Sequence, residues 1–213
     1  MIDAGGMAER VMNEALAAIV PPGVHAVCRA IRGGDRALLL PEEAVSISSR
    51  KDHRRDASGA ARHVARGLLG QAGFAASPIP KSASGAPIWR DGVVGSMAHD
   101  DAFAVAAVAS ATSFAGLGID IEPAEPLADD VAPLVRMPGD VLDGIDERLG
   151  SRLLFAAKET VYKATFPRDQ AFLGFEDVTI DFKRGAGLTR TGRSVRLVWR
   201  VTPRIVVLAF DPA

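Results

Sequence analysis

The chain of 213 residues lacks several features that mark particular classes of protein. It has one cysteine, Cys28, so it cannot form an internal disulfide bond. Its 25 basic and 26 acidic side chains leave a net charge of -1, so no overall field attracts nucleic acid or an anionic membrane. It also has no apolar run long enough for a membrane-spanning helix. We therefore expect neither nucleic-acid nor membrane partners.

The N-terminus has little of what a secretory leader requires. It contains Asp3 and Glu9, and no basic start is followed by a sustained apolar block. We therefore expect no signal peptide. Cys28 lies in the apolar run 24–31 with Arg29 as its only basic neighbour, which predicts a small buried side chain rather than a nucleophile. Together these features predict a cytoplasmic protein.

What the chain does have is an ordinary globular composition, with 48% hydrophobic and 24% charged residues. Its length suits one domain or two compact halves with a substantial core. Apolar periodicity predicts helices over residues 8–20, much of 41–70 and 146–165. Strands are expected at residues 24–31, 37–40, 93–94, 103–109, 116–122, 176–183, 195–201 and 205–210, with a glycine-rich turn at 185–187. Residues 124–144 read as mostly irregular, with one short helix.

One predicted strand places two acidic side chains on the same face. Alternation along it sends Ile119 and Ile121 into a core. Asp120 and Glu122 then lie side by side on the opposite face. Two neighbouring carboxylates repel and raise each other's pKa, so their ionised forms are stabilised mainly by a cation between them. Oxygen ligands of this kind suit Mg²⁺. The alternative is an edge strand whose polar face is simply hydrated.

A second group of charges interrupts the apolar helix predicted over residues 146–165. Glu159 and Lys163 are four residues apart and share a face, and Lys158 stands at the edge of that face. A third carboxylate beside two lysines would complete a magnesium site and hold a pyrophosphate, as phosphoryl transfer requires. The alternative is a surface Glu-Lys pair, which contributes little to stability.

Two further candidates are basic. Arg55, Arg62 and Arg66 would share one polar face of a helix, and this face either is solvated or binds an anion. His99 lies where a predicted strand gives way to a turn. It is either a hydrogen-bonded structural residue or a functional one.

The motifs that contain these residues resemble, in order and separation, those of 4'-phosphopantetheinyl transferases. The resemblance is to the Sfp/EntD type, which serves siderophore, polyketide and nonribosomal peptide synthases. The two signature motifs are Gly118-Ile119-Asp120-Ile121-Glu122-Pro123 and Phe155-Ala156-Ala157-Lys158-Glu159-Thr160-Val161-Tyr162-Lys163. The other matching elements are Arg54-Arg55, Ala61-Arg62-His63, Lys81, Gly85-Ala86-Pro87-Ile88-Trp89, Asp91-Gly92-Val93-Val94-Gly95-Ser96, His99 and Leu173-Gly174-Phe175-Glu176-Asp177-Val178.

This resemblance implies an α+β fold, a pseudo-dimer of two similar halves that are each a helix packed on a small antiparallel sheet. Residues 1–113 would contact the coenzyme A nucleotide, and residues 114–213 would hold the magnesium and pyrophosphate site. The implied reaction transfers 4'-phosphopantetheine from coenzyme A to a serine of an apo acyl or peptidyl carrier protein and releases adenosine 3',5'-bisphosphate. The implied cofactor is Mg²⁺, or Mn²⁺ in its place, and a monomer is expected.

The resemblance also implies roles for individual residues. The metal ligands would be Asp120, Glu122 and Glu159. The catalytic residues would be Glu159, Asp120 and Lys163, with Glu159 as the base that takes the serine proton. The contacts to coenzyme A would be Arg54, Arg62, Lys81, His99, Lys158 and Lys163, the two lysines of the helix on the pyrophosphate and the others on the nucleotide.

Three departures from the family pattern predict altered coenzyme A affinity rather than a different reaction. Ala98 stands where Ser or Thr is frequent, Asp100 and Asp101 directly follow the histidine, and the helix before Phe155 lacks a tryptophan. Two alternatives stay open. One is a magnesium-dependent hydrolase of nucleotides or pyrophosphates, and the other is a non-catalytic relative that binds coenzyme A or a carrier protein.

Overall fold

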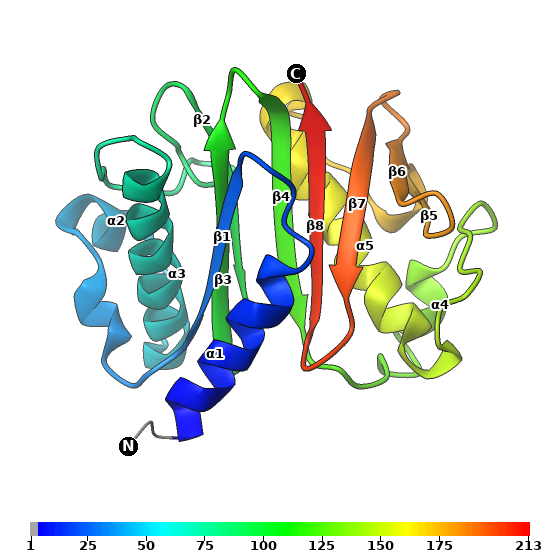
Figure 1. Ribbon diagram of the computed structural model, residues 1–213, viewed down its shortest axis with the longest axis horizontal. Coiled ribbons are helices and arrows are strands. Elements are labelled where there is room, and N and C mark those ends of the chain that lie inside the picture. Colours follow the sequence, from blue (N-terminus) through cyan, green and yellow to red (C-terminus); the bar gives the residue numbers. More distant parts are fainter. Residues whose placement is uncertain (1–3) are drawn as a thin grey trace.

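The computed structural model describes residues 4–213, which form two antiparallel sheets and the helices that cover them (Figure 1). The α-helices are α1 (Ala4–Ala17), α2 (Pro41–Ser46), α3 (Asp52–Gln71), α4 (Ala132–Val135) and α5 (Glu147–Asp169), and the 3-10 helices are η1 (Asp35–Leu38) and η2 (Phe175–Asp177). The strands are β1 (Val24–Ala30), β2 (Val93–His99), β3 (Phe103–Ser110), β4 (Phe114–Glu122), β5 (Val178–Asp181), β6 (Ala186–Thr189), β7 (Ser194–Arg200) and β8 (Ile205–Pro212). Within this part of the chain, no helix is both long and apolar enough to cross a membrane.

The two sheets meet at β2 and β4. The first sheet has the strand order β1-β3-β2, and the second has the order β4-β8-β7-β6-β5. At the seam, the backbone N–H of Ile119 on β4 donates a hydrogen bond of 3.0 Å to Oγ of Ser96 on β2. The predicted α+β fold of two halves, each with a helix packed on an antiparallel sheet, is confirmed.

Separate apolar clusters fill the layers on the two faces of the sheets. Met12 and Leu16 of α1 pack against strands of both sheets, and α1 lies in front of the strands in Figure 1. On the other face, α3 packs on β2 and β3, while α5 packs on β5 to β8. Strand β3 is therefore buried on both faces, which explains why residues 103–109 form an almost continuous apolar run.

Strand β4 shows the predicted alternation. Ile119 and Ile121 are buried in the cluster beneath α1. On the opposite face Gly118 lies so close to α5 that a Cβ there would overlap the carbonyl oxygen of Thr160. The missing side chain lets the α5 backbone lie on the strand. Because Asp120 is the next residue on this face, its carboxylate is presented to α5.

The predictions of local structure at residues 37–40 and 185–187 are wrong. Residues 37–40 do not pair back as a strand, because the chain turns into η1. The side chain of Asp35 drives this turn by accepting hydrogen bonds of 2.9 Å from the backbone N–H of Arg32 and from Nη2 of Arg29. Residues 185–187 are not all turn, because strand β6 begins at the middle one.

Candidate active site

A cavity of about 400 Å³ lies between the two halves. Helix α3, strand β2 and the loop at residues 81–89 line it from the first half, and β4 and α5 line it from the second. Six of the nine predicted site residues line this cavity, namely Arg62, Lys81, His99, Asp120, Glu159 and Lys163. The structure therefore brings together in space residues that lie far apart in the sequence.

Asp120 is the most buried carboxylate of the cavity, with 6% of its surface exposed. Its Oδ1 accepts a hydrogen bond of 2.7 Å from Nζ of Lys163. Its Oδ2 is buried and has no hydrogen-bond partner among residues 4–213. A buried oxygen without a partner is costly, so this atom is a ready acceptor for a cation or a ligand.

Glu159 enters the same cavity from α5. No side chain in the described part of the protein forms a hydrogen bond or ion pair with its carboxylate. Burial raises the pKa of Glu159 above its usual value, Lys163 opposes this shift, and the charge of Asp120 adds to it. A bound cation would favour the ionised form of this carboxylate.

Glu122 does not line the cavity, in contrast to the prediction that it converges with the other two acids. Its Oε2 accepts a hydrogen bond of 2.9 Å from Nη1 of Arg152 on α5. Burial and the charge of Asp120 raise the pKa of Glu122, whereas Arg152 lowers it. Among the residues that the structure describes, no group of three or more histidine, cysteine, aspartate and glutamate side chains is arranged to hold a metal ion.

The two carboxylates that do share the cavity nevertheless fit a divalent ion. The free Oδ2 of Asp120 and the unpaired Glu159 are oxygen donors on one cavity wall. Mg²⁺ is usually held by one or two carboxylates, together with water and substrate phosphates. The donor set is therefore one that Mg²⁺ prefers.

Lys158 does not line the cavity, although the resemblance implies that it contacts phosphate. Only 1% of its surface is exposed, and its Nζ lies 2.8 Å from Oδ2 of Asp140 and 2.8 Å from the carbonyl oxygen of Phe175. Burying an ammonium group is costly unless it is paired. Asp140, in the irregular stretch before α5, supplies the counter-charge.

Two cations line the cavity from the first half. Arg62 is almost fully buried, and its guanidinium donates hydrogen bonds to the carbonyl oxygens of Ile79 and Ser58. Burial lowers the pKa of Lys81, and the charge of Arg62 lowers it further. A lysine whose pKa is lowered by a neighbouring arginine marks a favourable place for an anion.

His99 lies between this cavity and a second hollow of about 470 Å³. Arg54 lines the second hollow and not the first, so the structure separates it from Lys81. Burial lowers the pKa of His99, a hydrogen bond with the backbone of Asp100 opposes this shift, and the charges of Lys163 and Lys81 strengthen it. The histidine thus connects the two hollows.

The acids that follow His99 are balanced by a cation from the other half. Nη1 of Arg204, between β7 and β8, lies 2.9 Å from Oδ2 of Asp100 and 3.2 Å from Oδ1 of Asp101. The same guanidinium lies over the ring of Phe103. The negative charges that depart from the family pattern are therefore compensated by an ion pair across the seam.

One wall of the cavity is apolar and was not expected from the sequence. Tyr162, Phe166 and Pro167 line it, and the rings of Tyr162 and Phe166 lie 5.3 Å apart. These residues follow Glu159 and Lys163 at helical spacings of three and four. That spacing was the signal that could have placed them on the face of the two charged residues.

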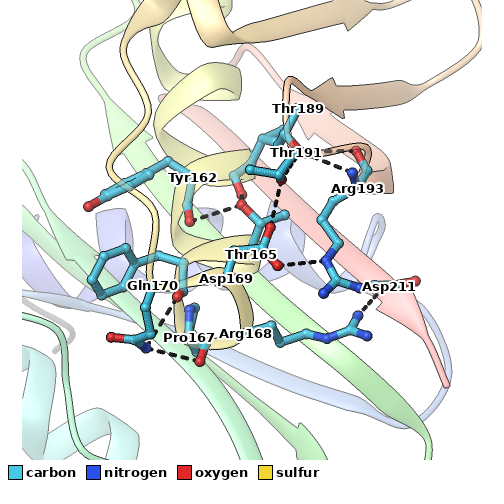
Figure 2. Close-up of polar contacts among 12 residues, drawn as sticks. Tyr162, Thr165, Pro167, Arg168, Asp169, Gln170, Thr189, Thr191, Arg193 and Asp211 are labelled. Atoms are coloured by element: carbon cyan, nitrogen blue, oxygen red, sulfur yellow. Dashed lines mark hydrogen bonds and ion pairs between the residues drawn. The ribbon is translucent and has the colours of Figure 1, made fainter.

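The end of α5 next to this wall is fixed by polar contacts (Figure 2). Asp169 accepts hydrogen bonds of 2.7 Å from Oγ1 of Thr191 and 2.8 Å from Nε of Arg193, both near the turn between β6 and β7. Arg168 pairs with Asp211 at 2.6 Å. These contacts tie the last turn of the helix to the second sheet.

The fold and the cavity together define a class of α+β protein in which two helix-on-sheet halves enclose one site. Known protein families identify this class. A family model for the 4'-phosphopantetheinyl transferase N-terminal domain matches residues 32–109, and one for the 4'-phosphopantetheinyl transferase superfamily matches residues 116–204.

Three relatives agree with this assignment. The 4'-phosphopantetheinyl transferase Svp of Streptomyces mobaraensis is 40% identical over 157 residues, which are 71% of this chain and 64% of that protein. Npt of Nocardia iowensis is 39% identical over 82% of this chain and 79% of its own length. PptT of Mycobacterium tuberculosis is 37% identical over 76% of this chain and 71% of its own length. The chain belongs to the 4'-phosphopantetheinyl transferase superfamily, and the predicted enzyme class is confirmed.

Proposed function

We propose that the protein transfers 4'-phosphopantetheine from coenzyme A to a serine of an apo acyl or peptidyl carrier protein and releases adenosine 3',5'-bisphosphate. The observation that supports this reaction best is one cavity in which cations of the first half face carboxylates of the second. A nucleotide with a diphosphate linkage offers anions to the cations and ligands to a metal held by the acids. Phosphoryl transfer depends mainly on such positioning and charge stabilisation.

The two halves divide the substrate between them in this proposal. Residues 1–113 bind the nucleotide end of coenzyme A through Lys81, Arg62 and His99. Arg54 lies across His99 in the second hollow and takes part in binding the 3'-phosphate from that side. Residues 114–213 hold the diphosphate and the metal.

Asp120 and Glu159 are the residues that we propose for Mg²⁺, because one has a free buried oxygen and the other has no partner. When bound, the ion neutralises charge on the diphosphate and its leaving group. Glu122 would join these ligands only on release from Arg152. Lys163 stays beside Asp120 and adds a positive charge to the same wall.

Glu159 is also our candidate for the base. Its raised pKa makes it a better proton acceptor than an ordinary carboxylate. It takes the serine proton, directly or through a water, as the serine oxygen bonds to the β-phosphorus. The bond from that phosphorus to the bridging oxygen then breaks, and the adenosine bisphosphate leaves. No covalent intermediate on the enzyme is required.

One incubation tests the proposal. The protein is mixed with an apo-carrier protein, coenzyme A and Mg²⁺, and the carrier is weighed by intact mass spectrometry. A carrier that gains the phosphopantetheine mass supports the transferase. Breakdown of coenzyme A with an unmodified carrier supports the hydrolase alternative, and no reaction supports binding only. The exposed Glu147→Gln on the same helix is a control that should keep full activity.

The remaining parts of the proposal concern the protein's setting. We propose that it acts as a monomer, because the two halves of one chain already enclose the cavity. We also propose a cytoplasmic location and carrier domains of siderophore, polyketide or nonribosomal peptide synthases as partners. Light scattering with and without an apo-carrier domain measures the first point. Activity towards a panel of apo-carrier domains measures the last.

A further inference from the structure

The most completely buried ion pair of the second half joins Lys158, the residue before Glu159, to Asp140. The side chains of Lys158 and Asp140 are 1% and 0% exposed, and their charged atoms lie 2.8 Å apart. Lys158 adjoins Glu159 in the sequence, yet it does not line the cavity. The pair therefore cannot meet a substrate without opening the protein.

Each partner of this pair joins separate segments. Oδ1 of Asp140 accepts a hydrogen bond of 2.9 Å from the backbone N–H of Ile180 on β5, and Oδ2 accepts one of 2.8 Å from that of Met137. Lys158 also donates to the carbonyl oxygen of Phe175 in η2. The pair thus connects α5, β5, η2 and the irregular stretch before α5.

The turn of α5 that presents Glu159 is held from two sides. On one side, Gly118 of β4 allows the carbonyl of Thr160 to lie on the strand without an intervening side chain. On the other side, Lys158 fixes the same turn to Asp140. Glu159 stands between these two contacts, and a shift of the turn would move its carboxylate relative to Asp120.

We infer that Lys158 and Asp140 form a positioning pair, which sets the place of Glu159 in the cavity and makes no contact with coenzyme A. The inference rests on the proposed function for the role of Glu159. It assigns to Lys158 a role different from the phosphate contact that the sequence motif suggests. It also gives a role to Asp140, which the motif does not contain.

Charge balance makes the inference testable. Removing one partner of a buried ion pair leaves the other buried and uncompensated, whereas replacing both with apolar groups is often nearly neutral. A phosphate-binding lysine would behave differently, because no change at Asp140 could restore its contact with the ligand. Recovery in the double variant therefore separates the two roles.

The experiment compares Lys158→Met, Asp140→Leu and the double variant. Thermal unfolding, kcat, KM for coenzyme A and calorimetric binding of coenzyme A are measured for each. We expect each single variant to lower the Tm by about 6 °C or more and kcat by about 10-fold, with KM within about 2-fold. The double variant should be more stable and more active than either single variant, although part of the loss remains because the backbone N–H groups of Ile180 and Met137 lose their acceptor.

The exposed pair of Lys183 and Asp143 is a matched control, because Asp143 lies in the same stretch of chain and the charged atoms are 3.7 Å apart at the surface. Lys183→Met should leave the Tm and kcat unchanged. Where a single variant fails to fold, the double variant must fold for the inference to stand.

Two results would overturn the inference. One is a Lys158→Met protein with an unchanged Tm and coenzyme A affinity weakened about 10-fold or more. The other is a double variant that is no more stable and no more active than the single ones. If the parent protein transfers nothing to any carrier, the proposed function fails, while the Tm values still show whether the buried pair is coupled.

Discussion

The two halves of the molecule share a helix-on-sheet architecture but place their closest backbone contacts differently. In the first half the glycine lies on the helix, and a Cβ at Gly59 of α3 would overlap the carbonyl oxygen of Asp35 in η1. In the second half the glycine lies on the strand, and a Cβ at Gly118 would overlap the carbonyl oxygen of Thr160 in α5. The second arrangement presses the helix onto β4, so the charged side chains of α5 meet Asp120.

The halves also differ in the charge that they bring to the cavity. The first half contributes Lys81 and Arg62, and the pKa of both is lowered. The second half contributes Asp120 and Glu159, with Lys163 bonded to Asp120. The difference teaches that the first half offers contacts for an anion, whereas the second half offers ligands for a metal ion. Substitutions on each side should therefore fail in different ways.

The largest effect is expected from Glu159→Gln, which removes the candidate base and metal ligand of the second half. We expect kcat to fall about 10²- to 10⁴-fold, measured as transfer to a carrier protein. The metal-free variant should nevertheless be more stable than the parent near neutral pH. Its Tm should rise by about 2–4 °C for each kcal/mol of repulsion and desolvation removed.

The pH dependence of that gain follows from the pKa shift. The pKa of Glu159 is raised in the folded protein, so the folded state holds the proton more tightly than the unfolded state. The parent therefore loses stability as the pH rises from the usual carboxyl pKa through the raised one, and the glutamine variant does not. Tm values of the two proteins should converge below this window. A variant that is less stable than the parent near neutral pH would contradict the account.

The next largest effect is expected from paired alanine substitutions at the two close contacts. Gly118→Ala and Gly59→Ala should each destabilise the fold by about 1–3 kcal/mol, because a backbone oxygen occupies the space of the new methyl group. Only Gly118→Ala should lower the kcat of the folded protein, because it displaces α5. Urea unfolding and kcat measure the two effects.

A matched control for this pair is Gly67→Ala, which lies on α3 with no other atom near the position of the new methyl group. It should be neutral or slightly stabilising, because alanine favours a helix more than glycine does. Equal losses of kcat in the variants at Gly118 and Gly59 would remove the proposed difference between the halves.

A smaller effect is expected from Lys81→Ala in the first half. The lysine has no ion-pair partner in the described part of the chain, so its removal should leave the fold intact. We expect KM for coenzyme A to rise about 10-fold with kcat nearly unchanged, because the lost contact binds substrate and transition state alike. Lys51→Ala, at an exposed position before α3, should change neither. A lower kcat with an unchanged KM would place Lys81 in the chemical step instead.

The smallest effect is expected from the titration of His99. Its pKa lies below the usual value of 6.5, chiefly because of burial, so the ring is mostly neutral near neutral pH. Coenzyme A affinity should rise a few-fold as the pH falls through this lowered pKa, because the charged ring attracts phosphate. Calorimetry with His99→Gln should show a flatter pH profile. An unchanged profile would exclude a contact between His99 and the ligand.

Much of this site was predictable because it follows regular periods. Alternation along β4 correctly placed Ile119 on the core face of the strand and Asp120 on the opposite face, where it lines the cavity. Helical spacing correctly put Glu159 and Lys163 on one face of α5. Both patterns depend only on neighbouring residues in the sequence. They predict the face on which a side chain lies, but not the residues that this face contacts.

The positions of the other predicted site residues depend on ion-pair partners that the sequence pattern does not reveal. The ammonium group of Lys158 is buried because Asp140 comes from an irregular stretch with no repeating pattern. Glu122 is held by Arg152, which is 30 residues away along the chain. Strand alternation predicts the face on which each side chain lies. It does not predict the oppositely charged partner, because the tertiary fold brings that partner from a distant part of the sequence.

The most direct test of the central claim is a crystal structure of the protein with coenzyme A and Mn²⁺, in which the metal is located by its anomalous scattering. The account predicts one metal peak in contact with Oδ2 of Asp120, the carboxylate of Glu159 and the diphosphate, with Lys81 on the nucleotide side. A coenzyme A molecule bound with its diphosphate away from both carboxylates, or a metal bound elsewhere, would contradict it.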